Sequence, residues 1–179
     1  ATQSYVVAYL ETLGYSPLFG TMTLATIYLI QIPTRFFIGY IERWIGPRYS
    51  LIMGTAGYLL YVILFPFASA KWHYIIIMVM WGFTSAIFWT GANVTLLNTT
   101  SEEKYGRALG ALYAGSGLGP ALGVLIMGWL MANFSGEYIF YFSIIPAALA
   151  VFIIASLDLD GKGKSEAVKV GSFRKFIRN

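Results

Sequence analysis

The stretch Gly39-Tyr-Ile-Glu-Arg-Trp-Ile-Gly46-Pro-Arg48 decides how this chain is arranged, because it is short and charged and lies between two long apolar runs. Residues 17–41 precede it and residues 50–69 follow it. Each run is about as long as a helix that crosses ~30 Å of hydrocarbon. We therefore predict a hairpin of two membrane-spanning helices, closed by a loop at residues 42–49.

The composition of the chain also places it in a membrane. Of its 179 residues, 58% are hydrophobic and only 11% are charged, whereas soluble domains carry roughly 25% charged residues. With so few charges, the chain cannot cover a water-facing surface. It has one His and no Cys, so we expect no disulfide, no metal site and no cofactor. No catalytic residue set can be assembled either, and we do not expect an enzyme.

Five full apolar segments follow a partial one at residues 1–10, which spans only about 15 Å as a helix. The full segments are 17–41, 50–69, 74–98, 107–132 and 138–157. Only helices and closed barrels satisfy their backbone in lipid, and barrel strands would be about 10 residues of alternating polarity. We predict an all-α, polytopic transmembrane bundle of six helices over residues 1–157, the first truncated, in a fragment of a longer protein. Short loops make neighbouring helices antiparallel.

The distribution of charge predicts which side of the membrane each connection faces. The loops 42–49 and 99–106, their flanks and the tail 158–179 carry ten cations, whereas the opposite loops carry only Lys71. The ten are Arg43, Arg48, Lys104, Arg107, Lys162, Lys164, Lys169, Arg174, Lys175 and Arg178. Cytoplasmic loops are enriched in Lys and Arg, so both loops and the tail are predicted to be cytoplasmic, in a plasma (inner) membrane. The tail is interpreted as a basic linker beside anionic lipid, not as a nucleic-acid site.

Some polar residues lie inside the predicted spans. Arg35 is about 10 Å from the cytoplasmic end of its helix, where a charge is costly unless it snorkels or faces water. Both interpretations stay open, and in the second Arg35 meets an anionic substrate. Ser85, Trp89 and Asn93 recur every four residues on one helix face. They either line a watery cavity or hydrogen-bond between helices.

Segment 107–132 is rich in glycine. Gly115, Gly119 and Gly123 recur at four-residue spacing, and small residues at this spacing let helices approach closely in lipid. Pro120 removes a backbone hydrogen bond and predicts a bend. The segment is either a tightly packed structural helix or a helix that pivots against a moving partner.

Taken together, these features resemble the N-terminal half of a major facilitator superfamily transporter over essentially the whole chain. The loop between the family's second and third helices follows Gly-x-Leu-Ala-Asp-Arg-x-Gly-Arg-Arg. The residues that match it are Gly39, Ile41, Gly46 and Arg48. Arg43 stands where the family has Asp, and Glu42 supplies an acid one position early.

Two further positions bear on this resemblance. The run Gly115-x-x-x-Gly119-Pro120-x-x-Gly123 resembles the family's Gly-Pro antiporter motif, which is associated with exporters. Met78 occupies the position of an Arg that the family uses in proton coupling.

The resemblance implies two inverted three-helix repeats and secondary active transport of a small organic solute by alternating access, with export favoured. It implies a second six-helix half as partner, besides the lipid bilayer. The implied gating residues are Gly39, Glu42, Arg43, Gly46 and Arg48. The implied hinge and packing residues are Gly115, Gly119, Pro120 and Gly123. The alternative is a receptor or scaffold that kept the fold and lost transport, as Arg43 and Met78 suggest.

Overall fold

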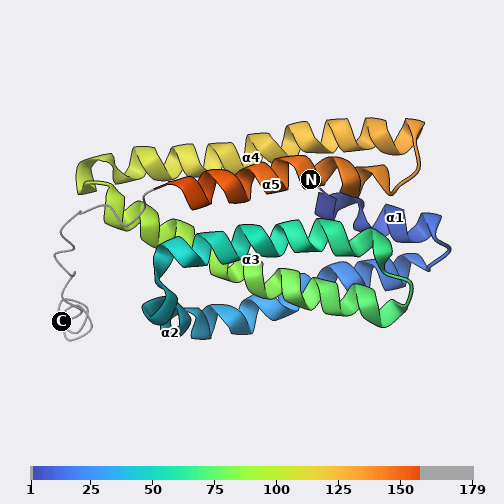
Figure 1. Cartoon of the computed structure of the whole chain (residues 1–179), viewed down its shortest axis with the longest axis horizontal. Coiled ribbons are helices and arrows are strands. Elements are labelled where there is room, and N and C mark those ends of the chain that lie inside the picture. The colour runs from blue at the N-terminus through green and yellow to red at the C-terminus, as the bar shows by residue number, and fades with distance from the viewer. Residues whose placement is uncertain (1, 158–179) are drawn as a thin grey trace.

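The computed structural model describes residues 2–157, and this part of the chain is a bundle of helices without strands. The elements are η1 (Thr2–Tyr5), α1 (Val6–Thr12), α2 (Pro17–Leu64), η2 (Phe65–Phe67), α3 (Lys71–Thr99), α4 (Glu102–Asn133) and α5 (Tyr138–Ser156). The long helical segments run back and forth along one axis (Figure 1). The all-helical prediction is confirmed. The predicted linker 158–179 lies outside the described residues.

Five helical segments of the described residues are long and apolar enough to cross a membrane, which confirms the predicted number of full spans. They are Pro17–Glu42, Trp44–Phe67, Lys71–Thr99, Glu103–Asn133 and Tyr138–Ser156. Large apolar side chains point outward along them, and Phe36 and Phe152 are 76% and 71% exposed. Apolar surface on this scale requires a nonaqueous environment or a partner.

The predicted eight-residue loop at 42–49 is wrong, because helix continues almost to the centre of this stretch. The helical ladder of α2 is broken only at Gly46, whose φ of 76° and ψ of 161° are not helical. A positive φ is strained for residues with a Cβ and is open to glycine. Pro47 follows with a ring that favours the first position of a helix. We call residues 17–45 the first arm of α2 and residues 47–64 the second arm.

The loop predicted at 99–106 is also shorter than expected. It is reduced to Thr100 and Ser101, because α4 begins at Glu102. Ser101 has the extended backbone of a residue that precedes a helix, with φ −68° and ψ 152°. Acidic residues follow it directly in the sequence, and these are favourable near a helix N-terminus.

The break at Gly46, the α3–α4 connection and the end of α5 all lie at one end of the bundle (Figure 1). We call it the Gly46 end. The core lies toward the opposite end, where aromatic rings from four helical elements pack together. Phe140 contacts Tyr9 and Phe65 at centroid distances of 4.9 Å each, and Phe65 contacts Tyr74 at 5.0 Å. The bundle is therefore solidly packed away from the Gly46 end.

Helix α3 packs between the two arms of α2, and glycines allow the close approach. A Cβ at Gly57 would collide with the side chain of Thr84, and one at Gly54 would collide with Phe88. A Cβ at Gly91 would lie 2.7 Å from Cβ of Ser50. Such contacts between small residues supply much of the packing energy of helices in lipid.

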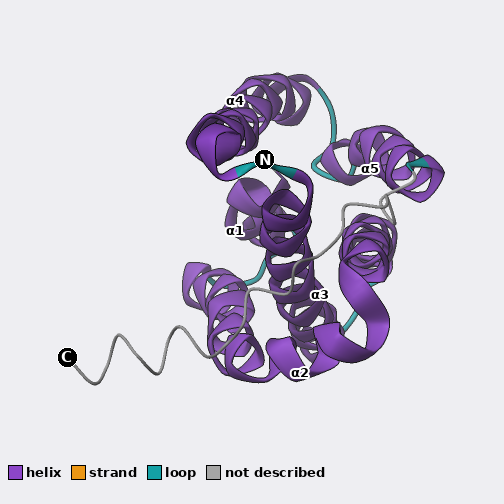
Figure 2. Cartoon of the chain, turned by 90° about the vertical axis from the view of Figure 1, so that its left-hand side faces the viewer, coloured by secondary structure: helices purple, strands orange, loops and turns teal. Residues whose placement is uncertain are grey.

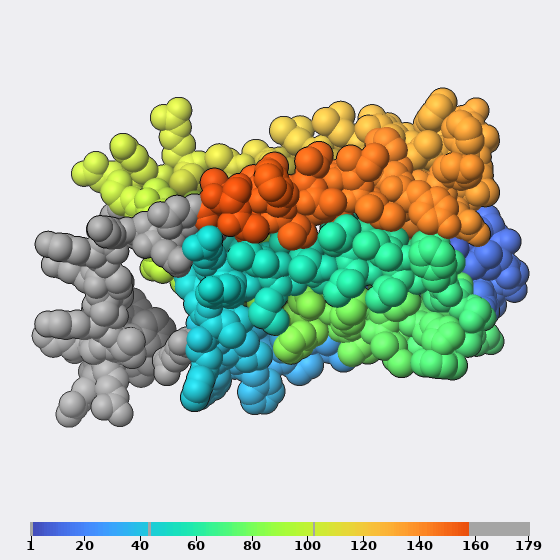
Figure 3. All heavy atoms as spheres, viewed as in Figure 1, coloured from blue at the N-terminus to red at the C-terminus, as the bar shows by residue number. Residues whose placement is uncertain are grey.

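Helix α4 lies at the edge of the bundle. Viewed along the helices, it lies over the N-terminal segment with α5 to one side (Figure 2), and Tyr5 Oη donates a hydrogen bond to the carbonyl oxygen of Val124 at 2.7 Å. In the space-filling view it forms the upper margin of the molecule above α5 (Figure 3). Most of its side chains are exposed, and no residue is buried in the most apolar 18-residue stretch of this helix.

Candidate functional site

The first arm of α2 and α3 approach most closely in the middle of the bundle. A Cβ at Gly82 would lie 2.8 Å from the carbonyl oxygen of Ile27. About one turn closer to the Gly46 end, Gln31 Nε2 donates a hydrogen bond to Ser85 Oγ at 3.0 Å. This pair joins the two helices and fixes their register. Arg35 lies one further turn along the same face of the first arm.

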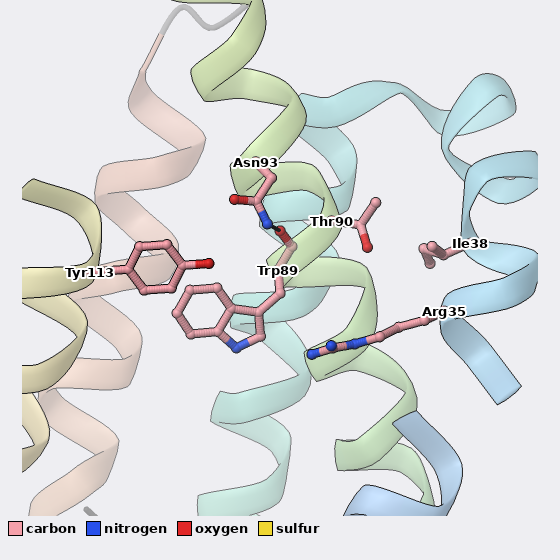
Figure 4. Close-up of a pocket in the computed structure, with 6 residues that line it drawn as sticks. All are labelled: Arg35, Ile38, Trp89, Thr90, Asn93 and Tyr113. Atoms are coloured by element: carbon pink, nitrogen blue, oxygen red, sulfur yellow. Dashed lines mark hydrogen bonds between the residues drawn. The ribbon is translucent and has the colours of Figure 1, made fainter. Parts of the chain in front are cut away.

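A cavity of about 420 Å³ lies between the Gln31–Ser85 hydrogen bond and the Gly46 end of the bundle. It is bounded by the first arm of α2, by α3 and by α4 (Figure 4). The residues that line it are Arg35, Ile38, Trp89, Thr90, Asn93 and Tyr113. Its volume lies within the range of about 300–1,000 Å³ that is typical of small-molecule sites.

The cavity lies inside the span rather than at its surface. Arg35 precedes Gly46 by eleven residues, or about 16 Å at the rise of an α-helix. Tyr113 follows the first residue of α4 by the same number. Both side chains therefore arise about halfway through a hydrocarbon layer of ~30 Å.

Two aromatic rings form one wall of the cavity. The rings of Trp89 and Tyr113 are stacked, with centroids 6.3 Å apart and 12° between their planes. Trp89 lies between Tyr113 and the guanidinium of Arg35 (Figure 4). This contact joins α3 to α4, which otherwise touches the bundle sparsely.

Polar groups on α3 complete the lining. Asn93 Nδ2 donates to the carbonyl oxygen of Trp89 at 2.8 Å, and Thr90 Oγ1 donates to that of Ala86 at 3.0 Å. The Thr90 hydroxyl proton and one of the two amide N–H groups of Asn93 are thus used within the helix. The Asn93 side-chain carbonyl and the lone pairs of Thr90 remain as acceptors that face the cavity region.

Arg35 is the one ionisable cation among the lining residues, and no acid accompanies it there. Arginine remains protonated in proteins, so the cavity carries a permanent positive charge. A charge at the centre of a membrane helix costs about 2.5–3.5 kcal/mol on insertion scales. Water or a bound anion in the cavity would offset this cost.

Three of the four residues predicted as possible cavity lining meet in this cavity, namely Arg35, Trp89 and Asn93. Ser85 is placed differently, because it is 5% exposed and accepts the hydrogen bond from Gln31 between the helices. Of the two predicted roles of Ser85, the structure therefore has the hydrogen bond between helices and not the lining of a water-filled cavity. The roles of the other three in binding stay predictions.

The predicted gating residues gather at the Gly46 end. Arg48 Nη2 donates to the carbonyl oxygen of Ala155 at 3.3 Å, which joins α2 to α5. Glu42 is half-buried, and its Oε1 is shielded from solvent without a hydrogen-bond partner among the described residues. Gly39 faces open space, and the side chain of Arg43 lies outside the described part. Their gating role stays a prediction.

The glycines of α4 do not pack against this chain as tightly as a structural helix would. A Cβ placed at Gly115 or Gly119 would meet no atom within 4 Å. Pro120 is exposed, and Gly123 is half-buried. Close packing through glycine occurs on α2 and α3, and on α4 only near its end, where a Cβ at Gly128 would lie 2.7 Å from Oη of Tyr5. A hinge or partner role of the α4 stripe stays a prediction.

Sequence reasoning missed three lining residues. Ile38 and Thr90 follow from helical geometry, since they lie three residues from Arg35 and Asn93 respectively and share their faces. Tyr113 carried a different signal, because it is the only aromatic residue between Gly106 and Gly128. A lone large ring on a helix of small residues marks the point where that helix reaches its neighbour.

The bundle, with five membrane-length apolar helices and a cavity inside the span, defines a multi-pass membrane protein. The sequence model of the Major Facilitator Superfamily matches residues 2–178. The chain therefore belongs to the Major Facilitator Superfamily, whose members are membrane transporters and generally not enzymes. No curated protein and no solved structure matched the chain significantly.

Proposed function

We propose that this chain works in secondary active transport of a small organic solute by alternating access. The observation that carries this proposal is the cavity between the first arm of α2, α3 and α4. It combines one cation, two stacked rings and free acceptors about halfway through the span. A purely structural bundle gains nothing from an unpaired charge at this depth.

The face of α4 supports a partner for this bundle. At Gly115 and Gly119 a Cβ would meet no atom of the described residues within 4 Å, and such open strips of backbone allow close helix contact in lipid. The proposed partner is a second six-helix half that rocks against this one around the cavity. The resemblance of Gly115–Gly123 to the antiporter motif favours export as the direction.

The proposed sidedness follows from charge. The Gly46 end carries the cationic connections, so it is placed in the cytoplasm, with the tail 158–179 on the same side. The aromatic core then lies nearer the outer face. A plasma (inner) membrane is the proposed location.

Alternating access can be tested without knowledge of the solute. These 179 residues contain no cysteine, so Thr90→Cys adds one thiol on the cavity wall, in a full-length protein in which any cysteine outside this chain has been replaced by serine. A membrane-impermeant maleimide should label it from either side of sealed vesicles, because each side opens in turn. Ile87→Cys, at a fully buried position of the same helix, should stay unlabelled from both. Labelling of Thr90→Cys from one side only would overturn the mechanism.

A receptor or scaffold without transport is the second candidate, and Met78 favours it. Met78 is fully buried in the apolar core, so no charge at this position serves proton coupling. Restoring the family residue there would bury an unpaired charge, which is strongly destabilising. Arg43→Asp is the usable test: solute uptake that remains absent both before and after this change supports the second candidate.

A further inference from the structure

We infer that the cavity binds a soluble organic anion with a flat aromatic ring, whose carboxylate lies on Arg35 and whose ring lies against Trp89. This inference rests on the proposed transport function and names its substrate class. It is carried by the charge of the lining, by the geometry of the rings and by the volume of the cavity.

The charge of the lining selects an anion. Arg35 is the only ionisable cation on the cavity wall, and no Asp or Glu lies among the other lining residues. Its guanidinium points along the wall toward Trp89 and away from the helix that carries it (Figure 4). A planar guanidinium matches a carboxylate with two parallel hydrogen bonds. A single cation without an acid beside it favours a monoanion and repels organic cations.

The rings select a flat partner. The indole of Trp89 is packed against Tyr113 on one side at a centroid distance of 6.3 Å, so its orientation is held. The indole lies next to the guanidinium in the cavity (Figure 4). Aromatic rings pack well against such a preformed face. A carboxylate joined to a ring would meet both groups at once.

The remaining acceptors refine this class. The hydroxyl proton of Thr90 and one amide N–H of Asn93 are used within α3, which leaves the side-chain carbonyl of Asn93 and the lone pairs of Thr90 as acceptors on this wall. A hydroxyl or amino substituent on the ring would supply the matching donor. The inferred ligand is therefore a small aromatic carboxylate, with donor substituents tolerated or preferred.

The test is equilibrium dialysis of the full-length protein in phosphatidylcholine nanodiscs with three probes: naphthoate, naphthalenemethanol and cyclohexanecarboxylate. Naphthoate should bind about tenfold or more tightly than each of the others, a difference of about 1.4 kcal/mol. The alcohol lacks the charge, and the cyclohexane acid lacks the flat ring. Equal affinity for naphthoate and either comparison compound overturns the inference.

Matched variants locate the site. Arg35→Gln should remove the preference for naphthoate over its alcohol, whereas Arg107→Gln, an exposed arginine near the start of α4 outside the cavity, should leave it unchanged. Trp89→Leu should weaken naphthoate more than cyclohexanecarboxylate, and the exposed Trp129 serves as control through Trp129→Leu. Arg35→Lys keeps the charge and loses the planar guanidinium that forms two parallel hydrogen bonds. It should retain part of the preference for naphthoate over its alcohol. Unchanged binding by Arg35→Gln overturns the inference.

The headgroup of an anionic lipid could occupy the same cavity, because it also carries a negative charge. A further measurement distinguishes a bound lipid from a soluble solute. Naphthoate binding should persist when phosphatidylglycerol is added to the discs, and its abolition would assign the cavity to the lipid and overturn a soluble solute. Failure of the transport proposal looks different. Naphthoate that binds and is never moved refutes transport and leaves this inference standing. A solute moved equally well by Arg35→Gln refutes the inference and leaves transport standing.

Discussion

The guanidinium of Arg48 donates a hydrogen bond from Nη2 to the carbonyl oxygen of Ala155 at 3.3 Å. Ala155 belongs to the last turn of α5, whose carbonyls carry the negative end of the helix dipole. The contact therefore joins the start of the second arm of α2 to the end of α5. It ties together two elements that are distant in sequence, at the end of the bundle that we propose to be cytoplasmic.

Replacement of this arginine should loosen that end only slightly. Arg48→Gln removes a cation from a helix C-terminus, an interaction that contributes about 0.3–1 kcal/mol when partly exposed. We expect a small decrease in melting temperature of the detergent-solubilised protein, larger at low salt. Arg107→Gln is the control for loss of one positive charge. Equal effects of both variants would show that the Ala155 contact is not stabilising.

Glycines that look alike in the sequence should differ in tolerance to a methyl group. In Gly57→Ala the new Cβ collides with the side chain of Thr84, and overpacking costs about 1–3 kcal/mol. In Gly117→Ala the Cβ meets no atom within 4 Å, and helical Ala is favoured over Gly by roughly 0.5–1 kcal/mol. Thermal unfolding should shift down for the first variant and not for the second. A downward shift for both would contradict the packing described.

The spans were predictable because length and hydropathy alone decide whether a helix crosses lipid. The shared cavity wall of Trp89 and Asn93 was also within reach, since four-residue spacing puts both on one helix face. Tyr113 could not be predicted as a lining residue, because its contact with Trp89 depends on how α4 is placed against α3. No local sequence pattern encodes that placement.

The contacts of the glycines also could not be predicted from local sequence patterns. A stripe of small residues indicates that a helix can be approached closely, and it does not say by which helix. The stripe of α4 is the most regular in the sequence, yet a Cβ at Gly119 would meet no atom within 4 Å in the described part of the chain, whereas one at the isolated Gly82 would lie against Ile27. The tightness of the Gly46 turn was equally hidden, because charged residues beside it are typical of a longer loop.

The backbone at Gly46 gives a prediction in which sterics play no part. A Cβ at Gly46 and a Cβ at Gly39 both meet no atom within 4 Å, and only Gly46 has a positive φ. With φ 76° and ψ 161°, this backbone is open essentially to glycine alone and costs residues with a Cβ on the order of 1–3 kcal/mol. Gly46→Ala should therefore lower the melting temperature, and Gly39→Ala should leave it level or raise it. The reverse order would show that the turn is not held at this φ.

The open face of α4 separates stability from assembly. Gly119→Leu adds a large side chain where a Cβ would meet no atom of the described residues within 4 Å, so the free energy of unfolding of the 179-residue chain should change by no more than about 0.5 kcal/mol. If a second half packs there, the same change should abolish solute uptake by the whole transporter. Gly117→Leu, nearly opposite on the helix, should be tolerated. Full uptake by Gly119→Leu would exclude this stripe as the contact.

Sidedness can be read with two engineered thiols, because the chain has no cysteine of its own. Trp44 lies beside the Gly46 turn and is 90% exposed, and Trp72 lies at the start of α3 at the other end and is 61% exposed. From the excess of cations we propose that the Gly46 end lies in the cytoplasm. An impermeant maleimide should label Trp44→Cys only in inside-out vesicles and Trp72→Cys only in right-side-out vesicles. The opposite pattern would mean that the topology is inverted. Labelling of both positions from the same side would mean that the segment between Trp44 and Trp72 does not cross the membrane.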